Sequence, residues 1–146
     1  MKISLWRILA SGVLFAIVAQ ILHTACAFLA MPFYTNPDYF TVWSKIMMPA
    51  AGPPPASFYL YSILFSLLSG ILFAIVYTVI KGGIPVKATA KKGLLYGFLV
   101  FLVGGVPGYL ALILLVNLPF ALIIFWAAET LIINLLGGMI AAWLNK

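Results

Sequence analysis

The sequence predicts an all-α membrane protein, a bundle of four transmembrane helices that forms one domain over residues 1–146. Three observations predict this class. The chain is 66% hydrophobic and only 7% charged, with a mean hydropathy of +1.23, whereas a soluble domain carries about 25% charged residues. The apolar residues gather in four runs, each long enough to cross a bilayer core of about 30 Å. The basic residues gather on one side of these runs.

The first apolar run is expected to form a helix over about residues 5–30. Gly12, Ala19, Gln20 and His23 share one face of that helix, and small residues let helices approach closely. This face should therefore pack against the other spans. The run exceeds the ~7–15 apolar residues of a signal peptide, so we expect the helix to be retained.

Residues 31–57 form the one long loop, which is predicted to lie on the outer side. Six prolines stiffen its ends. The segment from Asp38 to Met48 is expected to form a short interfacial helix, because aromatic residues such as Trp43 suit the membrane surface. The loop can then act as a lid or spacer, or as a surface for docking a partner.

The second helix is expected over about residues 58–80, with Ser62, Ser66 and Gly70 on its inward face. The loop over residues 81–92 follows and contains four lysines. Because cytoplasmic loops are enriched in basic residues, this loop is predicted to be cytoplasmic.

The third helix is expected over about residues 91–116, with one glycine-rich face that runs from Gly93 to Gly108. Pro107 has no N–H, which leaves the carbonyl of Val103 without its usual partner. We therefore predict a kink or local unwinding in the middle of this helix. The predicted break comprises Gly104, Gly105, Pro107 and Gly108.

A tight turn at Asn117-Leu-Pro119 precedes the fourth helix, expected over about residues 119–144. Four spans put both termini on one side, and the basic excess puts that side in the cytoplasm. The sequence thus predicts an N-in, C-in, multi-pass protein of a prokaryotic inner (plasma) membrane. The net charge of +6 is explained by this bias and by anionic lipids, so nucleic acid is not an expected partner.

Glu129 is the only acidic residue in any of the four runs. An ionisable group at the centre of a membrane helix costs about 2.5 kcal/mol or more, so a partner, a proton or a ligand should offset that cost. Counting residues along each span places Glu129, Ser66, Gln20, His23 and the helix break at Pro107 at adjoining depths. The candidate intramembrane site comprises Glu129, His23, Gln20, Ser66, Thr130 and Asn134.

Several interpretations of this site are open. Glu129 can be a structural carboxyl, a proton- or cation-coupled group, a contact for a ligand amine or hydroxyl, or a contact to a partner subunit. His23 can be a neutral structural side chain or a proton relay with Glu129. Cys26, His23 and Met31 are too few to bind zinc, which takes four ligands, so no metal and no cofactor are expected. Ser66 with His23 and Glu129 lacks any flanking catalytic motif, and we expect no enzyme.

Four stretches carry a resemblance: Val42-Trp43-Ser44-Lys45-Ile46-Met47, Lys92-Gly93-Leu94-Leu95-Tyr96-Gly97, the turn at Asn117-Leu118-Pro119, and Gly137-Gly138. In these the chain resembles small four-helix prokaryotic membrane proteins of families of unknown function. The resemblance implies the fold and the membrane location, and it assigns no site residue.

The expected function is a non-enzymatic packing or assembly protein, or a subunit that binds a lipid or a partner. Its partners would be membrane lipids, a second copy of the chain, or another membrane protein. The alternative is a small proton-linked transporter or channel that uses Glu129 with His23 and the helix break at Pro107.

Overall fold

The computed structural model describes residues 4–50 and 52–146 of the chain, and within them it contains helices and turns but no strand. Four helical segments are long and apolar enough to cross a membrane, which is the architecture of a multi-pass membrane protein. They are Leu5–Leu29, Ala56–Gly83, Thr89–Leu115 and Phe120–Leu144.

The first and fourth spans are the helices α1 (Leu5–Leu29) and α6 (Phe120–Leu144), and the second span contains the helix α3 (Ala56–Ile80). The third span is made of α4 (Thr89–Val100), a π-helical segment (Phe101–Gly105) and α5 (Val106–Leu115). All of these begin and end within two residues of the predicted spans.

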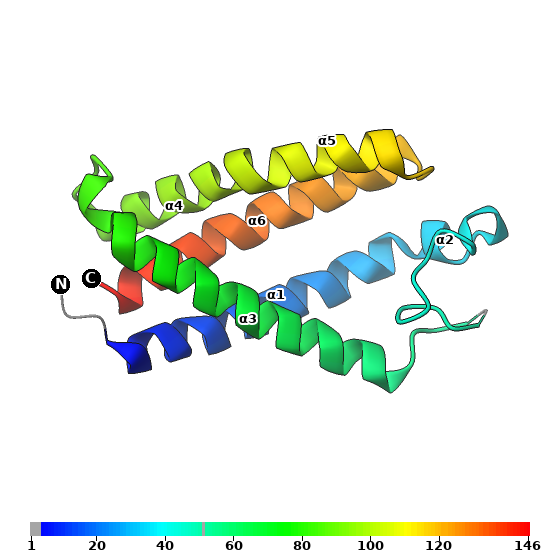
Figure 1. Cartoon of the computed structure of the whole chain (residues 1–146), viewed down its shortest axis with the longest axis horizontal. Helices are drawn as coiled ribbons and strands as arrows, with labels where there is room; N and C mark the ends of the chain where they lie inside the picture. Colours follow the sequence, from blue (N-terminus) through cyan, green and yellow to red (C-terminus); the bar gives the residue numbers. More distant parts are fainter. Residues whose placement is uncertain (1–3, 51) are drawn as a thin grey trace.

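The helices run antiparallel along the long axis of the molecule (Figure 1). Both termini and the connection between α3 and α4 lie at one end, called here the terminal end. The segment between α1 and α3 and the turn between α5 and α6 lie at the opposite end, called here the loop end.

Glycines allow the helices to pack closely in the terminal half of the bundle. A Cβ built at Gly93 would lie 2.5 Å from the carbonyl oxygen of Gly138, closer than any real Cβ contact. Gly97 is pressed in the same way against the backbone of Asn134. Backbone-to-backbone contact of this kind is what the small-xxx-small pattern Gly93/Gly97 predicts.

An aromatic core fills the space between the helices in this half. Phe15 and Phe73 lie with ring centroids 5.5 Å apart, and Tyr96 packs on Phe73 at 4.7 Å. The buried hydroxyl of Tyr96 donates a 2.7 Å hydrogen bond to the carbonyl oxygen of Phe73. At the terminal end, the amide of Asn145 donates to Ser11 Oγ at 2.9 Å, which joins α6 to α1.

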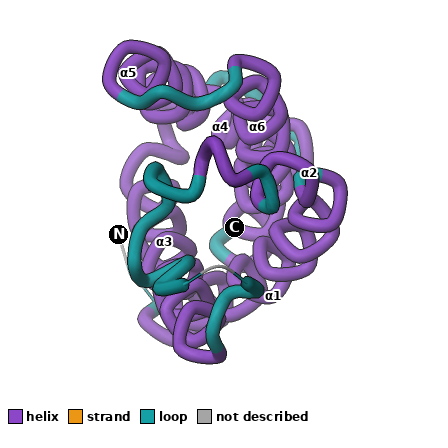
Figure 2. The backbone as a smooth tube through the Cα atoms, turned by 90° about the vertical axis from the view of Figure 1, so that its right-hand side faces the viewer, coloured by secondary structure: helices purple, strands orange, loops and turns teal. Residues whose placement is uncertain are grey.

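The bundle opens toward the loop end. None of the residues 106–115, all of them described, is buried. Seen from the loop end, α5 lies beside α6, whereas α3 lies with α1 on the other side (Figure 2). The two pairs of helices therefore pack closely at the terminal end and diverge at the loop end.

The predicted helix break is present as a widened turn. The N–H of Val106 donates to the carbonyl of Phe101, five residues earlier, directly before Pro107. The chain stays helical, so it is a π turn and not an unwound segment. A π turn holds one extra residue, which rotates the following helix relative to the preceding one.

The long loop differs from its prediction. It contains a single α-helical turn, α2 (Met31–Tyr34), and a 3-10 turn (Pro37–Tyr39), whereas the rest of the segment 38–48 forms irregular turns. The short helix predicted from Asp38 to Met48 is therefore not found. The buried indole of Trp43 packs between Tyr34 and Trp126, and this contact across the molecule takes precedence over local helix formation.

Candidate functional site

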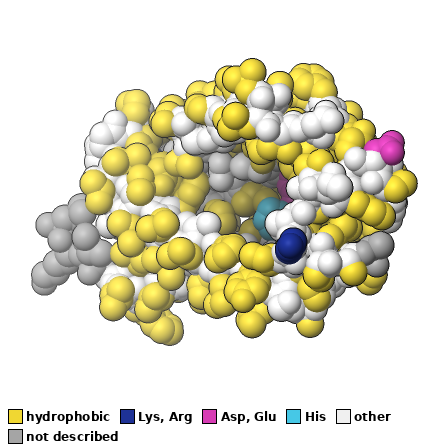
Figure 3. All heavy atoms as spheres, turned by 45° about the vertical axis from the view of Figure 1, so that its right-hand side comes forward, with side chains coloured by type: hydrophobic (Ala, Val, Ile, Leu, Met, Phe, Trp, Pro, Cys, Tyr) yellow, Lys and Arg dark blue, Asp and Glu magenta, His cyan; other side chains and the backbone are white. Residues whose placement is uncertain are grey.

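A cavity of about 710 Å³ lies between the diverging halves of the helices. Its walls come from α1, α3, α5 and α6, and residues of the long loop line it at the loop end. The hollow is visible in the space-filling view, with the imidazole of the single histidine in cyan inside it (Figure 3). Pockets of about 300–1,000 Å³ are typical of small-molecule sites.

His23 and Glu129 meet at this cavity. Nδ1 of His23 on α1 lies 2.5 Å from Oε1 of Glu129 on α6. The side chain of His23 is 44% exposed, whereas that of Glu129 is 8% exposed. The imidazole therefore faces the cavity and covers the carboxyl group behind it. The two groups that sequence analysis placed at adjoining depths form a hydrogen-bonded pair.

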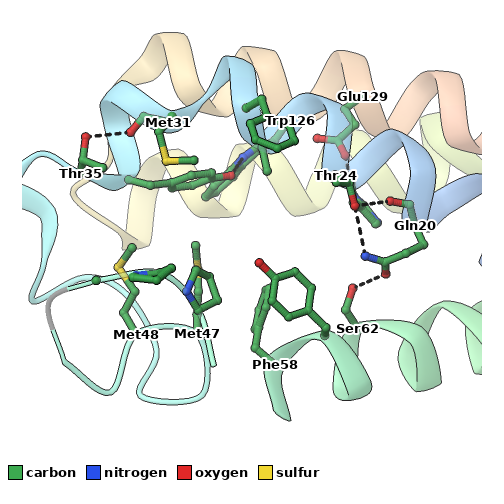
Figure 4. A pocket seen from close by; sticks show the side chains of 18 of the residues that line it. Gln20, Thr24, Met31, Thr35, Met47, Met48, Phe58, Ser62, Trp126 and Glu129 are labelled. Atoms are coloured by element: carbon green, nitrogen blue, oxygen red, sulfur yellow. Dashed lines mark hydrogen bonds and ion pairs between the residues drawn. The ribbon is translucent and has the colours of Figure 1, made fainter. Parts of the chain in front are cut away.

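Gln20 extends this polar region from α1 to α3. Its Oε1 accepts a 3.0 Å hydrogen bond from Ser62 Oγ, and its Nε2 lies 3.4 Å from Thr24 Oγ1. Figure 4 shows Gln20, Thr24, Ser62 and Glu129 gathered at one end of the cavity. This polar end is the deep end, because Glu129 lies nine residues, or about 13 Å, along α6 from its first residue.

The end nearer the loop is apolar. Met31 on α2 lies across the cavity from Met47 and Met48 of the loop, and Phe58 at the start of α3 faces the same space (Figure 4). The cavity is thus amphipathic, with hydrogen-bonding groups inside and thioether and aromatic groups at its entrance.

Two hydrogen bonds tie the walls together. The Tyr109 hydroxyl on α5 lies 2.6 Å from Thr130 Oγ1 on α6. The indole N–H of Trp126 donates to the Tyr34 hydroxyl at 3.0 Å, which fixes the loop to α6. Burial raises the pKa of Tyr34 from its ordinary value, so this phenol keeps its proton and remains neutral.

Two of the predicted site residues, Ser66 and Asn134, do not line the cavity. Ser66 is buried on α3 but does not line the cavity, and Ser62, one turn nearer the loop end, takes its place. Asn134 lies outside the cavity, in a shallow groove that also contains Gly104 and Gly108. Helix tilt accounts for the first difference, because counting from span centres assumes helices parallel to the membrane normal.

Sequence reasoning did not assign several polar residues of the cavity wall to the site, among them Thr24, Tyr34, Ser62 and Tyr109. A helical-wheel signal existed for two of them, since Thr24 lies four residues after Gln20 and Ser62 lies four residues before Ser66. Tyr34 and Tyr109 carried no such signal, because the fold of the loop and the π turn decide where they lie.

Metal-binding groups are not gathered here. Among the residues that the structure describes, no three His, Cys, Asp or Glu side chains lie close enough to hold an ion together. The chemistry available at the site is hydrogen bonding, proton exchange and contact with apolar or aromatic groups.

Comparison with protein families, with curated proteins and with solved structures finds no match to this chain. Any functional inference therefore depends on its own residues and their geometry.

Proposed function

We propose that this protein is a non-enzymatic membrane protein that binds an amphipathic small molecule in the cavity between α1, α3, α5 and α6. The amphipathic cavity of about 710 Å³ carries the proposal. Packing alone would not favour an opening of this size, because helices in membranes associate through close van der Waals contact. In the N-in, C-in orientation that we propose, the cavity opens toward the outer side.

The polar end of the cavity supports specific recognition. His23, Glu129, Gln20 and Ser62 contribute donors and acceptors from three helices, and a few placed polar groups in an apolar pocket are typical of ligand sites. The apolar entrance suits a hydrocarbon or aromatic body. A molecule that fits would place its polar group deep in the bundle and its apolar part near the loop.

The test is native mass spectrometry of the protein gently extracted from its own membrane. We expect a retained amphiphile in the wild type and its loss in Ala27→Trp, which fills the cavity from α1. Val13→Trp, on the exposed face of the same helix, should retain the molecule.

A second binding measurement uses 1-decanol as a defined probe of the protein in lipid nanodiscs. Saturable binding that Ala27→Trp abolishes would support the proposal. Absence of saturable binding, together with a bare protein in the mass spectrum, would refute it and favour an assembly role.

A second candidate function is proton-linked transport, and the His23–Glu129 pair, together with the π turn of the third span, favours it. Proton exchange needs an ionisable pair with access from the cavity, and π turns occur frequently at functional sites. Flux into proteoliposomes that depends on a pH gradient, and that Glu129→Gln abolishes in a folded protein, would support transport over binding alone.

A further inference from the structure

We infer that the molecule bound in this cavity is an amphipathic organic cation, and that the imidazole of His23 competes with it for the carboxyl group of Glu129. This inference rests on the proposed binding function and names its ligand class.

The charges around the cavity favour a cation. Among the described residues that line it, Glu129 is the only acid, and none is Lys or Arg. The described residues that line the cavity therefore provide no permanent positive charge for an anionic headgroup. A cation would find a carboxyl group at the deep end, where low water content strengthens the attraction.

The walls suit an ammonium group as well. Tyr34, Trp126 and Phe58 line the cavity from three different segments, and aromatic faces attract quaternary and primary ammonium groups. A phospholipid is a poor fit, because its headgroup would have to leave the membrane surface and enter the polar deep end. A free amphiphile with its charged group inward fits the order of the lining residues.

The imidazole of His23 occupies the position beside the carboxyl group of Glu129 that a bound cation would take. It lies 2.5 Å from the carboxyl oxygen and is far more exposed than the carboxyl. Rotation of the His23 side chain into the cavity that it lines would uncover the carboxyl without any movement of the backbone. The protonated imidazole neutralises Glu129 and should oppose a second cation, whereas the neutral imidazole leaves its charge available.

The sign of the pH dependence follows from this competition. The other titratable groups near the pair are Cys26 on α1, Tyr34 on α2, Tyr59 on α3 and Tyr109 on α5. Thiols and phenols carry no positive charge in either state, so they cannot take the place of the imidazole. Binding of the cation should release a proton from His23, and affinity should rise with pH.

The experiment compares three probes that share one alkyl chain and keep their charge at every pH: decyltrimethylammonium, 1-decanol and decyl sulfate. Their affinities for the full chain in phosphatidylcholine nanodiscs are measured by calorimetry. We expect decyltrimethylammonium to bind about tenfold more tightly than 1-decanol, with decyl sulfate weakest, because one buried carboxyl favours the cation.

Two substitutions, each of which neutralises one acidic residue, distinguish binding at the cavity from an effect of the overall charge of the chain. Glu129→Gln should reduce decyltrimethylammonium binding to the wild-type affinity of 1-decanol, because the amide keeps the shape of the side chain but carries no charge. Asp38→Asn, which removes the other acid of the chain from a position outside the cavity, should leave both affinities unchanged.

A pH series tests the competition itself. Wild-type affinity for decyltrimethylammonium should rise several-fold, by about tenfold at most, between about pH 5.5 and 8, where imidazole side chains change charge. His23→Gln retains a hydrogen-bond donor but has no imidazole to protonate, so its affinity should vary less with pH than that of the wild type. The wild-type probe series and pH series need no variant, so a variant that fails to fold leaves the test intact.

Equal binding of 1-decanol and decyltrimethylammonium would overturn the cation inference and leave amphiphile binding standing. Preference for decyl sulfate would overturn it too. Cation preference without pH dependence would overturn the role of His23. Failure of all three probes to bind would instead refute the proposed function on which the inference rests.

Discussion

The imidazole of His23 and the carboxyl group of Glu129 lie 2.5 Å apart across the contact between α1 and α6, although 106 residues separate them in the chain. Each is the only group of its kind among the four spans. A lone ionisable side chain in an apolar bundle is unfavourable, and a hydrogen-bonded pair lessens that cost. The pair also joins α1 and α6 at the cavity, so the same contact links two helices and forms part of the proposed binding site.

A double-mutant cycle should detect coupling between these two residues. We expect the effects of His23→Ala and Glu129→Ala on the free energy of unfolding to be non-additive by about 1 kcal/mol or less. The value is small because interhelical hydrogen bonds in membrane proteins contribute little on average and because the His23 side chain is 44% exposed. Glu129→Gln should destabilise less than Glu129→Ala, since the amide still bonds. Unfolding in mixed detergent micelles provides the measurement, and strict additivity would contradict a stabilising pair.

Glycines of the third span should respond differently to the same substitution. Gly97→Ala forces a methyl group into the backbone of α6 at Asn134, and overpacking of this kind costs about 1–3 kcal/mol. For Gly108→Ala, no described atom lies within 4 Å of the new Cβ, so we expect no loss of stability. Thermal unfolding of the two variants in one detergent checks this prediction, and equal effects would contradict the packing described here.

The hydrogen bond between Trp126 and Tyr34 should hold the loop over the cavity. Trp126→Phe removes it, and a net loss of about 1 kcal/mol should make amide exchange of residues 31–50 about fivefold faster. Trp43→Phe is the matched control, because its buried indole N–H has no acceptor among the described residues. Both variants lose the same volume in one aromatic cluster. Hydrogen exchange measured by mass spectrometry should therefore separate them.

Helix positions and inward faces were predictable from the sequence, because apolar runs and small-residue patterns are local. The depth match of His23 and Glu129 was predictable for the same reason, since it needs only helical rise and assumed span ends. The sequence did not show that Ser62 rather than Ser66 lines the cavity, because the crossing angles of the helices cannot be read from one sequence.

The third span shows what a helical wheel omits. A regular helix would keep Gly93, Gly97 and Gly108 on a single face, yet the first two pack against α6 and the third is open. The extra residue of the π turn at Phe101–Gly105 rotates α5 and brings Tyr109 to Thr130. The sequence predicted a break at Pro107 but not its π-helical geometry, which determines that Tyr109 lines the cavity.

The predicted orientation can be tested with two single cysteines in a Cys26→Ser background. Lys45→Cys lies in the long loop and Lys87→Cys in the connection between α3 and α4, and both positions are exposed. In an N-in, C-in protein, a membrane-impermeant maleimide added to intact cells should label Lys45→Cys and spare Lys87→Cys, because basic loops remain cytoplasmic. After lysis both should react, which controls for accessibility. The opposite pattern would reverse the topology, turn the cavity entrance toward the cytoplasm, and require that any ligand reach it from inside the cell.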